Sequence, residues 1–262
     1  MRTSNPVLKD DVFAPQGAFA GGEVMTVQGT TNKSLLLLGF LLAAAVWIWS
    51  RAIPQVVVGM SLEDVAARAS ASMAAVTPFM IGGGILGFIL ALVTVFKKEW
   101  AGYTAPLYAV CEGLVLGGIS ALFELRYPGI VTQAVALTFG TLFCLLMAYK
   151  TGIIRVTDKF RLGVFVATAA IGLVYLVSWI LSFFHVQVPF MVGSGLVSIG
   201  FSLFVVGIAS LNLVLDFDFI ERGAEANAPK YMEWYGAFGL MVTLVWLYIE
   251  ILQLLAKLRG RD

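Results

Sequence analysis

Charged residues are scarce in this sequence. Only 13% of its 262 residues are charged, whereas 60% are hydrophobic. A soluble domain of this length is typically about 45–50% apolar and about a quarter charged. The scarcity of charge therefore excludes an ordinary soluble domain and predicts an integral membrane protein whose main partner is the lipid bilayer. The net charge of +1 also argues against a nucleic-acid-binding surface.

Cysteine and histidine are almost absent. Cys111 and Cys144 both lie inside apolar stretches, and we expect small core residues there rather than a disulfide framework or reactive thiols. His185 is the single histidine, which excludes any site that needs several, and we expect it in a loop between helices. No cofactor is expected from this composition, with calcium considered only as a transported ion.

Seven apolar stretches meet or approach the length of a membrane-spanning helix, about 20 residues. They comprise residues 34–50, 71–96, 101–123, 130–149, 162–184, 188–215 and 235–255. The fold class is therefore all-α, a polytopic bundle of seven transmembrane helices over residues 34–256. We expect residues 1–33, which show no cleavable signal peptide, to form a mobile cytoplasmic tail, and residues 257–262 to form a short basic tail.

The distribution of Lys and Arg predicts the orientation. With seven spans, 11 of them fall on the side of the N terminus and 6 on the other side. The positive-inside bias then places the N terminus in the cytoplasm. The basic residues Lys257, Arg259 and Arg261 fit an external C terminus poorly, so six spans with a re-entrant last segment are the alternative.

Four acidic side chains lie within or at the end of these stretches, namely Glu112, Asp216, Asp218 and Glu250. A carboxylate in hydrocarbon costs roughly 2.5–3.5 kcal/mol on insertion scales. A chain that keeps one there typically uses it to pair helices or to line an ion path. Glu250 shares a helix face with Thr243 and Gln253, and such a polar face is expected to avoid lipid.

Each acid has a second interpretation. Tyr108 lies one turn before Glu112 and can donate a hydrogen bond to it, so Glu112 is either an anchor between helices or a functional carboxyl. Asp216 and Asp218 point about 200° apart on a helix, so at most one of them faces a shared interior. We favour a functional role for Asp216 and an interfacial one for Asp218. Glu233 precedes two aromatic residues and is also expected at the membrane interface.

We expect acids from the third, sixth and seventh spans to meet in one water-accessible pocket. Carboxyls that converge in a low-dielectric interior cannot all be ionised, so they share protons, bind a cation or pair with an arginine. Arg155 and Arg161 are both candidates for that arginine. Calcium takes about 6–8 oxygen ligands, so a calcium site at Asp216 and Glu250 would be weak.

Three segments resemble the Bax inhibitor-1 family, also called transmembrane Bax inhibitor motif proteins, and its bacterial branch in particular. They are EGLVLGGIS (residues 112–120), VLDFDFIERG (residues 214–223) and YMEWYGAFGLMVTLVWLYIEILQLL (residues 231–255). The segment MTVQGTTNKS (residues 25–34), which precedes the first span, also resembles this family. The resemblance implies a seven-helix bundle with a central last helix in the bacterial cytoplasmic membrane. It also implies a pH-sensitive calcium leak, sensed by two aspartates that share a proton and are latched by an arginine. The first aspartate corresponds to Asp216. At the second position this chain has Trp246, with Glu250 one turn later.

Two functions remain open at this point. The first is a calcium or proton leak channel gated by protonation of its carboxyls. The second is a non-transporting regulator of stress or cell death that binds membrane-protein partners, with the acids as structural contacts. We do not expect an enzyme, because Ser194 and His185 lack a third group to orient them as a catalytic pair.

Overall fold

The computed structural model describes residues 23–54, 60–185, 188, 191 and 193–260. In this part of the chain the long helices are α1 (Val27–Ala52), α2 (Leu62–Phe96), α3 (Ala101–Arg126), α4 (Ile130–Lys150), α5 (Asp158–Ser182), α6 (Leu196–Glu225) and α7 (Met232–Arg259), with the short 3-10 helix η2 (Lys98–Trp100) before α3. All seven α-helices are long and apolar enough to cross a membrane. This confirms the seven-span bundle, and the last segment is a continuous helix rather than a re-entrant one.

Several helices extend beyond the apolar stretches that predicted them. α1 begins at Val27 because the side chain of Thr26 caps it by accepting a hydrogen bond from the backbone N–H of Gly29. Ser61 caps α2 in the same way, so much of the loop expected before residue 71 is helix. The boundaries drawn at residues 33 and 257 therefore fall inside α1 and α7, and residues 1–22 lie outside the described residues. Apolarity marks only the part of a helix that lies in hydrocarbon.

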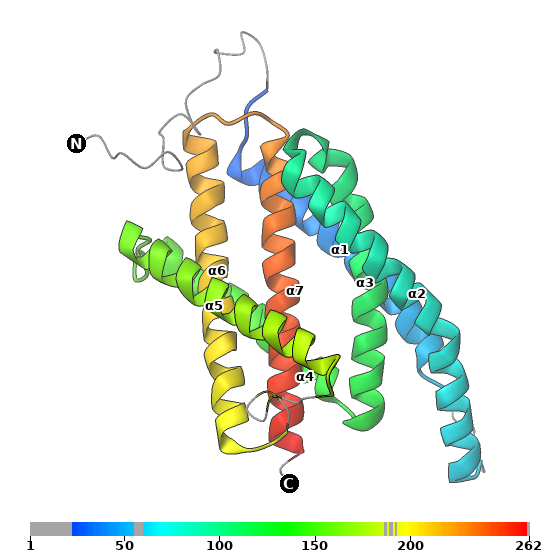
Figure 1. Ribbon diagram of the computed structural model, residues 1–262. Coiled ribbons are helices and arrows are strands. Elements are labelled where there is room, and N and C mark those ends of the chain that lie inside the picture. Colours follow the sequence, from blue (N-terminus) through cyan, green and yellow to red (C-terminus); the bar gives the residue numbers. More distant parts are fainter. Residues whose placement is uncertain (1–22, 55–59, 186–187, 189–190, 192, 261–262) are drawn as a thin grey trace.

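α7 occupies the centre of the bundle (Figure 1), as the family resemblance implied. It packs against α1, α3, α4 and α6. One face of α7 contributes Ala237, Phe238, Met241 and Val245 to a core shared with α1 and α3. Farther along the helix, α7 contributes Leu247, Ile251 and Leu252 to a second core with α4 and α6. α7 is therefore shielded from lipid over most of its length.

The other helices surround this arrangement. α2 lies outside α1 and α3, and α5 crosses α6 obliquely on the opposite side of the bundle (Figure 1). α1 begins and α7 ends at opposite ends of the bundle. We call these ends the Val27 end and the Arg259 end.

α1 and α3 approach each other closely through glycines of α3. A Cβ atom on Gly113 would lie 2.3 Å from the carbonyl oxygen of Leu41, and one on Gly117 would lie 2.4 Å from that of Ala45. The small-residue pattern predicted for this helix is therefore a packing surface. Cys111 on the same helix is buried as expected, but Cys144 on α4 is exposed, because its stretch of α4 faces outward.

Replacing Gly117 by Ala should destabilise the bundle. The added methyl group cannot fit against α1, and overpacking of this kind costs about 1–3 kcal/mol. At Gly140 of α4 an added Cβ meets no atom within 4 Å, so Gly140→Ala should be neutral or stabilising, by up to about 1 kcal/mol of helix preference. Thermal unfolding in detergent measures both. Equal unfolding temperatures for the two variants would contradict the close α1–α3 contact.

Candidate functional site

A stripe of polar side chains follows the surfaces on which α5, α6 and α7 meet. On α5 it comprises Arg161, Thr168 and Tyr175, which recur at every seventh residue and so lie on one face. On α7, Thr243, Glu250 and Lys257 have the same spacing. On α6 the stripe comprises Ser198, Ser202, Asn212, Asp216 and Asp218. We call these residues the polar stripe.

The hydrogen bonds of the stripe determine the register of α6 against α7. Near the Arg259 end, Lys257 Nζ donates to Ser202 Oγ at 2.8 Å. Farther towards the Val27 end, the carboxyl of Asp216 interacts with the hydroxyl of Thr243. These two contacts are fourteen residues apart on both helices, or about 21 Å along the axis. The polar stripe therefore extends across much of the membrane thickness.

At the Val27 end of the stripe, two arginines hold Asp218. Arg161 Nη2 lies 2.8 Å from Asp218 Oδ2, and Arg222 Nε lies 3.1 Å from the same oxygen. The sequence offers both Arg155 and Arg161 as the arginine that pairs with a buried aspartate, and it favours a place at the membrane interface for Asp218. The structure pairs Arg161 with Asp218 and not with Asp216. A buried aspartate paired with arginine is therefore present, but it is Asp218 rather than Asp216.

Asp216 precedes Asp218 by two residues on α6 and lies farther from the Val27 end. Its Oδ2 atom is buried and has no hydrogen-bond partner among the described residues. The neighbouring Asn212 donates to Thr168 Oγ1 at 2.8 Å, which ties α6 to α5 at the same depth. An ionised carboxyl in such a place is costly unless it is compensated. Asp216 is therefore suited to take up a proton or a passing cation.

Glu250 is the most enclosed acid of the stripe, with 2% of its surface exposed. Its Oε1 accepts hydrogen bonds from Tyr175 Oη at 2.6 Å and from Trp246 Nε1 at 3.1 Å. Its Oε2 is buried without a partner in the described part of the chain. Trp246, one turn before Glu250 on α7, thus serves as a hydrogen-bond donor to it.

Glu112 does not belong to this stripe. It hydrogen-bonds Tyr108, as its spacing predicted, and Tyr108 packs edge-on against Phe238 of α7 at 5.1 Å between ring centroids. The Glu112 carboxyl itself points towards α2, because a Cβ atom on Gly87 would lie 4.0 Å from its Oε2. The structure thus places Glu112 between α3 and α2, in the position of a helix anchor.

The expectation that the acids meet in one pocket is wrong. The α6–α7 register places Glu250 two helical turns from the level of Asp216, or about 10 Å along the axis. Asp218 has its own arginines, and Glu112 lies on another helix pair. No cluster of three or more His, Cys, Asp or Glu residues suited to a metal ion occurs in the described ranges. Asp216 and Glu250 therefore lie at different levels of the polar stripe, and a weak calcium site at these two residues stays a prediction.

Glu233 has a structural role that sequence reasoning missed. Its side chain is fully buried at the start of α7. It accepts hydrogen bonds from the backbone N–H and the hydroxyl of Thr26, both at 2.9 Å, and it forms ion pairs with Lys33 and Lys230. The interface prediction placed it correctly at a helix end, but only the fold reveals that it joins the start of α1 to the start of α7.

The remaining stripe residues were also missed, although the sequence carries a signal for them. Thr168 and Tyr175 on α5 repeat with Arg161 at a helical spacing within an otherwise apolar stretch. Lys257 was assigned to a tail, but it lies in the last turns of α7 and reaches α6. A search for periodic polar residues, rather than for acids alone, would have found these positions.

Comparison with known proteins gives a match to a protein family. A family model described as Bax inhibitor 1 like matches residues 5–260, which is nearly the whole chain. No curated protein and no solved structure gives a match.

Removal of the charge on Glu233 should loosen the Val27 end of the bundle. In Glu233→Gln the two lysines lose their buried counter-ion, and hydrogen bonds to a charged group contribute about 1.5–3 kcal/mol. We expect a lower unfolding temperature and faster proteolysis near Thr26. Glu99→Gln is the matched control, because Glu99 is exposed. If the two variants unfold alike, Glu233 does not hold α1 to α7.

Proposed function

The chain belongs to the Bax inhibitor 1 like family, and on that premise we propose that it is a pH-sensitive cation leak whose pathway is the polar stripe. The observation that carries this proposal is the position of the unpartnered polar atoms. In the described part of the chain, the buried side-chain oxygens without a hydrogen-bond partner are Ser198 Oγ, Asp216 Oδ2 and Glu250 Oε2. All three belong to the stripe.

The order of the groups supports a stepwise pathway. A cation or proton entering at the Val27 end first meets Asp218 and its arginines. It then reaches Asp216 and Glu250, each of which offers one free oxygen. It leaves past Lys257, Ser202 and Ser198. Levels about 10 Å apart are too distant for direct transfer, so water or helix movement must connect them.

α5 is the element suited to act as a gate. It packs mainly on α6, and three side chains attach it to the rest of the bundle, namely Arg161 to Asp218, Thr168 to Asn212 and Tyr175 to Glu250. Loss of these contacts lets α5 move away and admits water to the stripe. The Arg161–Asp218 pair at its first turn is the latch in this proposal.

The direction of the pH effect follows from the carboxyl charges. Ionised Asp216 and Glu250 attract a cation, whereas protonated ones do not. Leak should therefore fall as the pH is lowered. With one free oxygen at each level, calcium would be bound only in passing, since it takes about 6–8 oxygens, and a proton needs just one.

We place the pathway in a bacterial cytoplasmic membrane, with the Val27 end in the cytoplasm. This orientation rests on the excess of Lys and Arg on that side. The competing function, a regulator that binds membrane-protein partners, would use the same acids only as helix contacts. It does not account for the buried carboxyl oxygens that lack a hydrogen-bond partner among the described residues.

Neutralising the two free acids should abolish the leak. Asp216→Asn combined with Glu250→Gln removes both charges while keeping the side-chain shapes. We expect ion flux near that of protein-free liposomes at every pH, measured with trapped calcium and pH indicators in parallel. Glu112→Gln is the control, because it neutralises an acid off the stripe, and it should keep the flux and its pH dependence. If the double variant conducts like the unaltered protein, the pathway lies elsewhere.

Breaking the latch should increase the leak. Arg161→Gln leaves Asp218 with Arg222 alone on its own helix and detaches the first turn of α5. Flux should rise at all pH values in the same liposomes. Lys159→Gln removes one charge from an exposed position on the same turn and should leave the flux unchanged. Equal flux from the two variants would refute the latch.

A further inference from the structure

A groove opens on the face of α7 opposite Thr243, Glu250 and Lys257. It consists of two cavities between α1 and α4, of about 270 Å³ and 670 Å³. Leu38 of α1 and Met241 and Leu244 of α7 line both cavities, so the two adjoin. We call the smaller one the inner cavity and the larger one, which reaches the Val27 end, the outer cavity.

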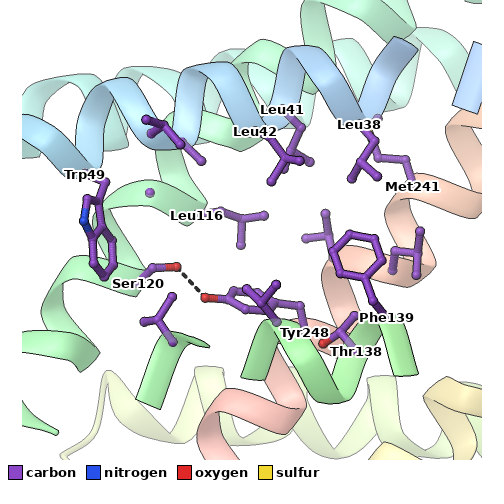
Figure 2. Close-up of a pocket in the computed structure, with 17 residues that line it drawn as sticks. Leu38, Leu41, Leu42, Trp49, Leu116, Ser120, Thr138, Phe139, Met241 and Tyr248 are labelled. Carbon is purple, nitrogen blue, oxygen red and sulfur yellow. Dashed lines mark hydrogen bonds between the residues drawn. The ribbon is translucent and has the colours of Figure 1, made fainter. Parts of the chain in front are cut away.

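The lining of the inner cavity is almost entirely apolar. Figure 2 shows its apolar lining, with leucines of α1 facing Phe139 of α4 and Met241 of α7. Its hydroxyl groups already have partners, because Ser120 and Tyr248 hydrogen-bond each other at 2.6 Å and Thr138 donates to Ala134 O at 2.8 Å. The chemistry of this cavity therefore fits hydrocarbon.

The inner cavity lies where hydrocarbon is available. The side chains at its rim include Leu42 and Val46 of α1 and Val135 and Phe139 of α4, all exposed. In a membrane-spanning helix these positions face acyl chains. Along α1 the cavity extends from Leu38 to Trp49, or about 16 Å, which is about half the thickness of a hydrocarbon core of about 30 Å.

The outer cavity has free positive charge. Both of its acids are already engaged, because Asp218 pairs with two arginines and Glu221 accepts a hydrogen bond from Tyr149. Lys150 and Arg155 also line this cavity. Both are exposed, and neither has an ion pair or a side-chain hydrogen bond to any described residue. The end of the groove at the membrane surface is therefore complementary to an anion.

We propose that this groove binds one phospholipid with an anionic headgroup. The acyl chain lies in the inner cavity between α1 and α4, and the phosphate lies beside Lys150 and Arg155 at the mouth of the outer cavity. Hydrocarbon contacts alone do not favour the groove over bulk lipid, since lipid tails are as apolar as leucine. Selectivity for this lipid therefore comes from its headgroup. α7 separates the acyl-chain part of the site from Asp216 and Glu250, whereas the headgroup part lies beside Asp218, which lines the outer cavity and pairs with Arg161.

Native mass spectrometry of the full chain in mild detergent tests the proposal. The probes are phosphatidylglycerol, which is anionic, and phosphatidylcholine with the same acyl chains. The unaltered protein should retain about one phosphatidylglycerol per chain and less phosphatidylcholine. Lys150→Gln with Arg155→Gln should weaken phosphatidylglycerol binding by roughly 10- to 30-fold. Lys97→Gln with Lys159→Gln, which removes the same charge from two other exposed positions on that side, should not.

Filling the inner cavity tests the position of the acyl chain. Val135→Phe places a larger side chain in the groove, and Leu137→Phe places the same side chain on an exposed part of α4 outside it. Lipid retention should be lost in the first variant and kept in the second. A thermal unfolding scan of both shows whether the bundle remains folded.

Three results would overturn the proposal. In the first, Val135→Phe and Leu137→Phe retain lipid equally, or the two double-glutamine variants bind phosphatidylglycerol equally. In the second, a dimer that Val135→Phe dissociates shows a second copy in the groove. In the third, lipid binds only after residues 1–22 are deleted, which shows that this segment of the chain fills the groove.

Discussion

An ionisable side chain at membrane depth must be shielded from lipid, and the central position of α7 satisfies this constraint. α7 is enclosed by α1, α3, α4 and α6, so Glu250 is buried although it lies deep in an apolar segment. The donors Tyr175 and Trp246 then compensate one of its oxygens. If α7 lay at the edge of the bundle, the same glutamate would face hydrocarbon at a cost of several kcal/mol.

The two faces of α7 differ in chemistry. One face lies on the polar stripe, where it forms hydrogen bonds with α5 and α6. Another borders a groove in which every hydroxyl group of the inner cavity is already satisfied. The buried polar atoms that lack a hydrogen-bond partner among the described residues therefore lie on the stripe side of α7, and the apolar cavity lies on its other side. The proposed ion pathway and the proposed acyl-chain site therefore lie on different faces of α7.

The Val27 end holds the charged contacts that fix the bundle. Glu233 binds Thr26, Lys33 and Lys230 and so joins the first helix to the last. Just before α1, the backbone N–H of Met25 donates to Ala228 O in the loop before α7 at 2.7 Å. These contacts lie where the membrane surface offers water and where charged pairs are less costly than at the midplane. They restrain α1 and α7, whereas α5 takes no part in them.

The sequence by itself determined the class of the protein, the number of its spans and the presence of costly acids within them. Length and apolarity are properties of one segment at a time, so they could be read without knowing any neighbour. The tertiary structure alone decided which groups meet. Asp218 rather than Asp216 has the arginines, Glu112 turns towards α2, and Glu233 is a buried junction. These pairings depend on how each helix is rotated, by about 100° per residue, and on which helices lie beside it. Neither quantity is encoded in the hydrophobicity of a single stretch.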